Sequence, residues 1–223
     1  MNKKYIKVSL MINILIIVFT IFSTIIMFTG FKFMSGEHLL ETSKIGMLKF
    51  FTVDSNIFMG LVSLIFCTDE VKLLQGKINE IPKRYYVLKL TSTVGVTLTF
   101  LTVFGYLGFI MDGVVVELLK NSNLFFHLIT PLLSIITFIF FEKTDKLNFK
   151  YTIFGISPTI IYALFYLINV LIHIENGRVS PVYDWYYFVQ GGIINAVIVL
   201  PLMLTISYLI SLLLWKFNRK IFS

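Results

Sequence analysis

Long apolar segments alternate with short polar ones along the whole chain. A helix that crosses a membrane needs about 20 mostly apolar residues, and six segments approach or exceed this length. They cover residues 8–33, 50–67, 88–111, 124–141, 151–172 and 192–215. Their interiors are runs of Ile, Leu, Phe and Val, without the alternation of apolar and polar residues that a membrane barrel requires. The pattern predicts an all-α polytopic membrane protein, a single bundle of six transmembrane helices over residues 1–223.

Composition supports this prediction. The 223 residues are 57% hydrophobic and 14% charged, with a mean hydropathy of +0.87, whereas a soluble domain is roughly 45–50% apolar and about 25% charged. The first segment is too long for a removable signal peptide and lacks a small-residue cleavage site, so we expect a signal anchor. The single cysteine, Cys67, excludes an intramolecular disulfide and a cysteine-based metal cluster.

The basic residues indicate the orientation of the bundle. Of the 19 Lys and Arg residues, 14 fall on one side of six alternating segments. These are Lys3, Lys4, Lys7, Lys72, Lys77, Lys83, Arg84, Lys89, Lys143, Lys146, Lys150, Lys216, Arg219 and Lys220. The positive-inside rule therefore predicts that both termini are cytoplasmic. The net charge of +7 is explained by this bias and by anionic membrane lipids as partners, with no nucleic acid required.

Polar side chains inside the apolar segments gather near the predicted outer face. The stretch KFFTVDSNIFM (49–59) holds four of them within five residues. The full set is Thr52, Asp54, Ser55, Asn56, His127, Asn169, His173, Gln190 and Asn195. Such groups usually face the bundle interior or a water-filled cavity. The inner halves of the same segments contain almost none, so we expect one polar layer near the outer face.

Helical spacing divides this set further. Thr52, Ser55 and Asn56 share a helix face, whereas Asp54 lies about 200° from Thr52 at 100° per residue. His127 and Pro131 are four residues apart. Proline removes the amide that would bond the carbonyl of residue 127, so we expect the backbone beside the histidine to open.

Simpler interpretations exist for each residue. Thr52 and Ser55 are typical helix caps, and Asp54 suits a helix N-terminus because of the dipole. Asn169 and Asn195 have the amide chemistry that joins helices in membranes.

Four side chains have the chemistry of metal ligands. His127, His173, Asp54 and Asp184 are possible ligands, but no HExxH or similar spacing occurs. We therefore predict no metal and no cofactor.

Four stretches taken in order resemble a known family. KFFT (49–52), NLFFHLITP (123–131), YLINVLIHIENG (166–177) and SPVYDWYYFVQGG (180–192) are similar to segments of the androgen-induced and androgen-dependent TFPI-regulating membrane proteins. The resemblance covers about 140 residues and extends to bacterial integral-membrane relatives.

The two named members hydrolyse fatty acid esters of hydroxy fatty acids with a threonine and a histidine. The resemblance therefore implies that Thr52 is the nucleophile and His127 the general base. The family's acidic residue lies three positions after the threonine, whereas Asp54 lies two after and Asn56 four after. We expect Asp54 or Asn56 to orient the imidazole, as the third member of a catalytic triad does.

The predicted function is hydrolysis of a lipid or acyl ester within a cell membrane, the plasma membrane of a bacterium. A site near the outer face keeps the ester close to water while acyl chains lie among Phe-rich helices. The substrate-binding candidates are Ser55, Asn169, His173, Tyr183, Asp184, Gln190 and Asn195.

Two other functions fit the same polar layer. One is a non-enzymatic sensor or transporter that binds a small or lipid ligand there. The other is a structural subunit whose polar groups only join helices.

Overall fold

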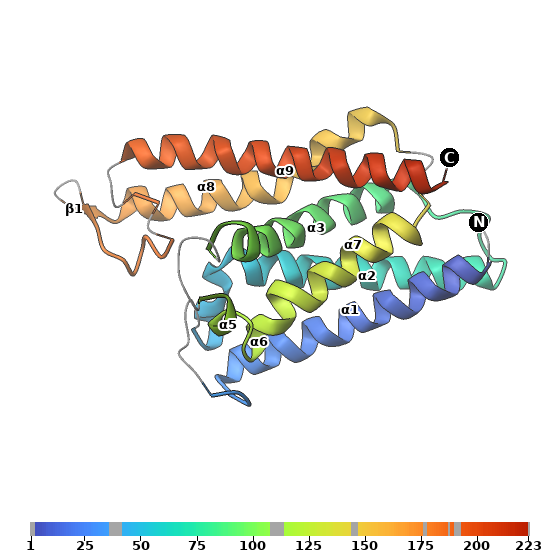
Figure 1. Cartoon of the computed structure of the whole chain (residues 1–223), viewed down its shortest axis with the longest axis horizontal. Helices are drawn as coiled ribbons and strands as arrows, with labels where there is room; N and C mark the ends of the chain where they lie inside the picture. The colour runs from blue at the N-terminus through green and yellow to red at the C-terminus, as the bar shows by residue number, and fades with distance from the viewer. Residues whose placement is uncertain are drawn as a thin grey trace.

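The computed structural model describes residues 3–35, 42–107, 114–143, 147–175, 178–186, 188–189 and 193–222. The chain forms long helices that lie side by side along the longest dimension of the molecule (Figure 1). Within the described ranges, five helical segments are long and apolar enough to cross a membrane. They are Lys3–Thr29, Lys83–Gly105, Ser122–Phe140, Phe149–Ile172 and Asn195–Phe222. The predicted all-α class is confirmed.

The first half of the chain forms three long helices. They are α1 (Lys3–Thr29), α2 (Phe51–Leu74) and α3 (Lys83–Thr102). A 3-10 turn, η1 (Lys44–Lys49), precedes α2, and a π-helical turn, η2 (Val103–Leu107), continues α3. Residues 108–113, the end of the third predicted helix, lie outside the described residues.

The second half begins with short helical pieces. They are α5 (Val114–Glu117), α6 (Ser122–Leu124) and a second π-helical turn, η3 (Phe125–Ile129), which leads into α7 (Thr130–Phe140). A 3-10 segment, η4 (Phe149–Ile156), continues into α8 (Ser157–Ile172). Two short strands, β1 (Ile174–Glu175) and β2 (Arg178–Val179), pair antiparallel before α9 (Ile193–Phe222).

The helix ends differ from the predicted ones in a way that matters for the interior. The second helix was predicted to end at residue 67, but α2 continues to Leu74 and buries Asp69 and Glu70. The third was predicted to start at residue 88, but α3 begins at Lys83 and buries Lys89. The bundle also contains α2, a long helix that is not among the five segments named above.

α3 lies at the centre of the bundle, in contact with α2, α7, α8 and α9. Small side chains allow these close contacts: a Cβ placed on Gly95 would lie 3.3 Å from the Ser55 Cβ of α2. The threonines of α3 return their hydroxyls to their own helix, as when Thr97 donates to the Thr93 carbonyl at 2.7 Å. This arrangement agrees with the close packing that small and hydroxyl residues permit between membrane helices.

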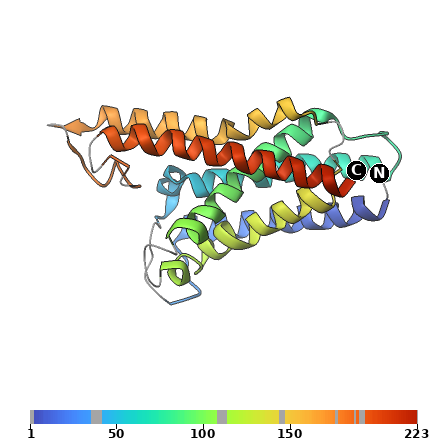
Figure 2. The same cartoon turned by 45° about the horizontal axis from the view of Figure 1, so that its top comes forward.

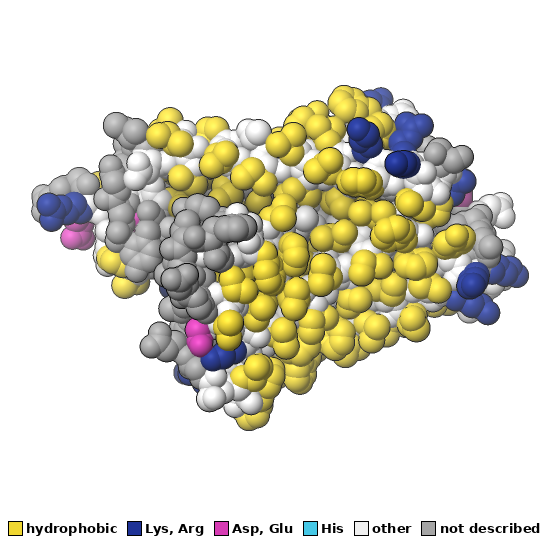
Figure 3. Space-filling model, in the orientation of Figure 1, with side chains coloured by type: hydrophobic (Ala, Val, Ile, Leu, Met, Phe, Trp, Pro, Cys, Tyr) yellow, Lys and Arg dark blue, Asp and Glu magenta, His cyan; other side chains and the backbone are white. Residues whose placement is uncertain are grey.

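The surface and the chain ends are arranged along the bundle axis. Both termini lie at the same end of the molecule in both ribbon views (Figures 1 and 2). Apolar side chains cover the flank seen in Figure 3, and most of the visible Lys and Arg gather at the end that holds the termini. The molecule therefore has an apolar flank and a basic end.

Candidate functional site

The start of α2 carries the candidate nucleophile. Phe50 is the N-cap residue, so neither Thr52 nor Ser55 caps this helix, and that simpler interpretation is wrong. The Ser55 hydroxyl instead donates to the Thr52 carbonyl at 3.1 Å, and the Asn56 amide donates to the same oxygen at 2.8 Å. The side chains of this turn are thus held against their own backbone.

The candidate base lies in the π-helical turn η3. His127 is the third of its five residues, and its side chain is only 7% exposed. The turn ends directly before Thr130 and Pro131, the first residues of α7. Single π-helical turns inside helices occur frequently at functional sites. A local change of helix geometry beside His127 agrees with the opening that Pro131 was expected to cause.

Asn56 links these two turns. Its side-chain nitrogen also donates to the carbonyl of Phe126 at 3.1 Å. One amide group therefore bonds both the backbone of Thr52 and the backbone of the residue before His127. Because Thr52 lies between Ser55 and Asn56 around the helix axis, its side chain belongs to the face of α2 that turns toward α3 and η3.

Asp54 has a different position. α2 is regular from Phe51 onward, so Asp54 points about 200° away from Thr52. Its side chain is half-buried. Of the two residues proposed to support the imidazole, Asn56 shares the face of Thr52 and Asp54 does not.

Three buried polar atoms around this point have no hydrogen-bond partner among the described residues. They are the Asn56 Oδ1, the His127 Nδ1 and the Thr130 Oγ1. Most buried polar atoms in proteins are hydrogen-bonded, and each exception requires an explanation. An available imidazole nitrogen and an available amide oxygen so close to the start of α2 are the groups that a polar ligand would use.

Aromatic side chains from α8 and the following loop cover the start of α2. The Phe51 amide donates to the Tyr186 hydroxyl at 3.0 Å, and the Tyr162 hydroxyl donates to the Lys49 carbonyl at 2.5 Å. Trp185 in turn donates from its indole nitrogen to the Tyr162 hydroxyl at 3.0 Å. No local pattern in the sequence points to Trp185 or Tyr186, because their role depends on a contact with a helix more than a hundred residues earlier.

The other candidate residues form a separate group at the end of α8. The Asn169 amide donates to the Tyr183 carbonyl at 2.7 Å, so it joins α8 to a loop and not to another helix. The His173 ring stacks on Tyr183 with the ring centroids 3.5 Å apart. Asp184 is buried and accepts hydrogen bonds from the Tyr166 hydroxyl and, at 3.1 Å, from the Val189 amide.

Two candidates contribute little that can be described. Asn195 is exposed near the start of α9. Gln190 lies outside the described residues.

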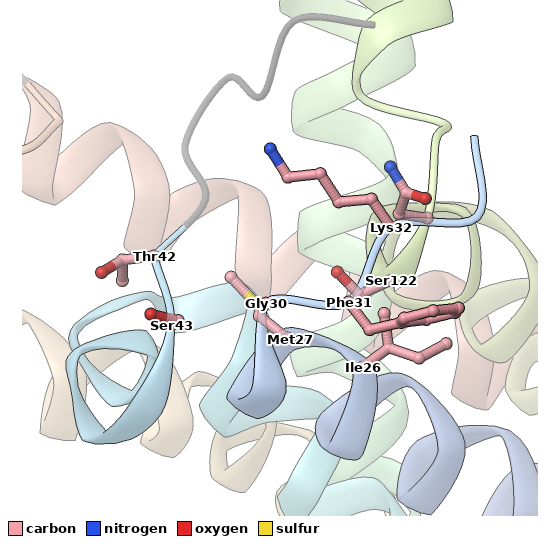
Figure 4. A pocket seen from close by; sticks show the side chains of 9 residues that line it. Ile26, Met27, Gly30, Phe31, Lys32, Thr42, Ser43 and Ser122 are labelled. Carbon is pink, nitrogen blue, oxygen red and sulfur yellow. The ribbon is translucent and has the colours of Figure 1, made fainter. Parts of the chain in front are cut away.

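A cavity of about 300 Å³ lies beside this region (Figure 4). It is lined by Ile26, Met27, Gly30, Phe31, Lys32, Thr42, Ser43, Asn121 and Ser122. Neither Thr52 nor His127 lines it. Met27, however, packs in the same buried cluster as Val53 and Phe126, the neighbours of those two residues in the chain. The cavity is therefore adjacent to the candidate site and distinct from it.

The expectation that the inner halves of the helices lack polar groups is wrong. Glu70, Lys89 and Glu142 are each at most 1% exposed inside the bundle, and Lys89, counted above among the basic residues of the cytoplasmic side, is buried in α3. One feature of the sequence pointed to them: Asn13 and Ser9 interrupt an otherwise apolar run at helical spacing. Among the described residues, no group of three or more His, Cys, Asp and Glu side chains is placed to hold a metal ion.

Comparison of the chain with known protein families, with curated proteins and with solved structures finds no match.

Proposed function

We propose that this chain is an integral-membrane hydrolase of lipid esters, with Thr52 as the nucleophile and His127 as the general base. The observation that supports it most is the bridging amide of Asn56, which bonds the carbonyls of Thr52 and Phe126. That bridge keeps the turn with the hydroxyl next to the turn with the imidazole. The resemblance to the threonine- and histidine-dependent family is what assigns the roles of nucleophile and base to these two residues.

The chemistry follows from the two groups. A threonine hydroxyl is a weak nucleophile until a neighbouring base accepts its proton. In the first step the Thr52 oxygen attacks the ester carbonyl, and its proton passes to His127. The protonated imidazole then donates that proton to the departing alcohol, which leaves an acyl–threonine ester. In the second step a water molecule attacks this ester and gives a proton to His127. The imidazole returns the proton to the Thr52 oxygen as the acyl–oxygen bond breaks, and the carboxylic acid is released.

The membrane topology that we propose has six spans, which are the five apolar segments named above together with α2. Both termini are then in the cytoplasm. An even number of crossings returns the chain to its starting side, and both termini lie at one end of the bundle (Figure 1). The gathering of Lys and Arg at that end (Figure 3) agrees with the positive-inside rule. Thr52 and His127 then lie toward the outer face of a bacterial plasma membrane.

Turnover of p-nitrophenyl esters of graded acyl length by the purified protein tests the proposal. Thr52→Ala and His127→Ala are expected to lower turnover by about 10²–10⁴-fold, the usual contribution of such groups, with unchanged melting temperatures. Thr52→Ser retains a hydroxyl and should retain part of the activity. Thr29→Ala is a control, because Thr29 is a threonine at the terminus of another long helix, where its hydroxyl donates to the Ile25 carbonyl at 2.8 Å. Full turnover in both alanine variants would refute the mechanism.

The cavity of about 300 Å³ favours a second candidate, the non-enzymatic binding of a lipid or small ligand. Its lining combines apolar side chains with Lys32, Ser43 and Asn121, a mixture typical of ligand pockets. A fluorophosphonate probe distinguishes the two functions: Thr52-dependent covalent labelling supports the hydrolase. A ligand-induced rise in melting temperature with no covalent adduct supports binding alone. If alanine at Thr52 and His127 changes only the melting temperature, these groups are structural.

A further inference from the structure

A second polar cluster lies inside the bundle, toward the end that holds the two termini. It draws on four parts of the chain: Ser9 and Asn13 of α1, Glu70 of α2, Lys89 of α3, and Glu142 just after α7. Each of these side chains is at most 1% exposed. Charged residues at such depth are costly in a membrane protein and usually functional.

Asn13 is the centre of this cluster. Its amide nitrogen lies 3.1 Å from the Glu142 Oε1, 3.4 Å from the Glu70 Oε2 and 3.3 Å from the Ser9 hydroxyl. Its oxygen accepts a hydrogen bond from the Lys89 ammonium. Because one amide nitrogen contacts both carboxyl groups, Glu70 and Glu142 lie close to each other.

Lys89 is the counter-charge. Its ammonium lies 3.4 Å from the Glu142 Oε1 and donates to the Ser63 hydroxyl at 3.0 Å. The remaining oxygens, Glu70 Oε1 and Glu142 Oε2, are buried without a hydrogen-bond partner among the described residues. Two carboxyl groups therefore lie near one ammonium, which pairs directly with Glu142, and two of their oxygens have unused bonding capacity.

Four other described residues lie near the cluster. Cys67 of α2 is a free, buried thiol three residues before Glu70. Tyr86 of α3 contacts the Phe66 ring, which lies beneath the Lys89 ammonium. From α9, the Asn218 amide donates to the Glu142 backbone carbonyl at 2.7 Å. The next acid on α2, Asp69, is paired with the half-exposed Lys72 at 2.9 Å.

We propose that Glu70 and Glu142 together bind one exchangeable proton. With that proton the cluster is neutral: one carboxyl group is protonated, and the other is ionised against Lys89. The protonated carboxyl supplies the hydrogen that an unpartnered carboxylate oxygen requires. Two carboxylates in one site cannot both ionise without mutual repulsion, which strongly raises one of their proton affinities. A proton fits better than a metal cation, because the Lys89 ammonium repels a second positive charge.

The charge of the cluster, and hence the packing of the elements around it, depends on this proton. When it leaves to water, the cluster gains a net negative charge between α1, α2, α3 and the end of α7, and the packing of these elements weakens. The site is thus a buried proton-binding site that makes the packing of the bundle depend on pH. It shares no residue with the Thr52 and His127 pair, so the two proposals can be tested independently of each other.

Infrared spectroscopy of the whole protein in lipid nanodiscs tests this assignment. A protonated carboxyl group has a carbonyl stretch that is well separated from that of a carboxylate, and ¹³C labelling of glutamate alone shifts the glutamate bands away from those of aspartate. We expect a labelled protonated band at pH 7 in the wild type. Glu70→Gln and Glu142→Gln should each remove it, because a single carboxylate then matches Lys89. Asp69→Asn is the control and should leave the band unchanged.

Three outcomes would overturn the proposal. The first is the absence of a protonated glutamate band in the wild type at pH 7, a measurement that needs no variant. The second is the same band in the wild type and in either glutamine variant that folds. The third is a band that disappears when sodium replaces choline at constant pH, which would assign the site to a metal cation.

Discussion

The two polar regions of the bundle are built from different chemistry. Around Thr52 and His127, uncharged donors bond mainly to backbone carbonyls, with the Asn56 amide bridging two turns. Around Lys89, side chains bond to other side chains, and three of them are ionisable. The first region leaves an imidazole nitrogen and an amide oxygen without a partner among the described residues, whereas the second links helices through charged side chains. Variants that affect one region and not the other test this difference.

The largest effect on stability is expected from Lys89→Met. Removal of the ammonium leaves two buried carboxyl groups without a counter-charge, and breaking a buried ion pair costs about 3–5 kcal/mol. The free energy of unfolding, measured by titration of detergent-solubilised protein with a denaturant, should fall by this amount. Lys72→Met is the matched control, because Lys72 forms a half-exposed pair with Asp69, which contributes about 0–1 kcal/mol. Equal losses in both variants would show that the cluster around Lys89 contributes no more to stability than a surface ion pair.

Asn56→Ala tests the region around Thr52 and His127. The change leaves the carbonyls of Thr52 and Phe126 without their shared donor and should cost about 1–3 kcal/mol. It should also lower ester turnover, because the two turns are no longer linked. Thr52→Ala, in contrast, should abolish turnover with little change in stability. If Asn56→Ala reduced neither quantity, the bridge would have no role.

The pH dependence of stability should come from the cluster around Lys89. Burial raises the pKa of Glu142, which follows the end of α7, above its ordinary value of 4.5, and the charge of Lys89 offsets part of this rise. The folded protein then binds more protons than the unfolded chain between the two pKa values. The stabilisation is complete below about pH 4.5 and is lost as the pH rises through the folded pKa.

Thermal melting at a series of pH values measures this slope. Glu142→Gln should flatten it, and Thr52→Ala, in the other region, should leave it unchanged. A slope of the same size in the Glu142→Gln protein would assign the pH dependence to another group.

The smallest effect is expected from Tyr186→Phe. This change removes only the hydroxyl that accepts the Phe51 amide proton at the start of α2. A single hydrogen bond contributes about 0.5–1.5 kcal/mol, so the melting temperature should fall slightly. Tyr183→Phe is a control, because the contact of Tyr183 with His173 is ring stacking. An equal change in both variants would argue that the Tyr186 hydroxyl does not hold the start of α2.

The predicted elements and the observed ones agree where the evidence was local. The apolar runs located the long helices, and Pro131 indicated a change of geometry at His127, where the π-helical turn lies. The helix ends were less predictable, because charged residues such as Glu70 and Lys89 are costly inside a membrane and are expected in loops. They are accommodated in α2 and α3 only because Asn13 and Glu142 supply partners.

The structure brings together only some of the residues that were predicted to form one polar layer. Four polar residues within five positions identified the start of α2, and the structure joins it to η3 through Asn56. His173 and Tyr183 instead stack on each other at the end of α8. Helical spacing gives the face of a side chain but not the neighbouring helix, and depth along a helix does not give lateral position.

By itself, the sequence determined the helical class, the approximate limits of the long helices and the face that Thr52 shares with Asn56. These are properties of neighbouring residues, set by apolar length and by the helical repeat. Only the tertiary structure decided which polar side chains meet. Asn13 lies 76 residues from Lys89 and 129 from Glu142. Their cluster exists because three helices and the end of a fourth converge, and a buried charge is tolerated only where such convergence supplies its partners.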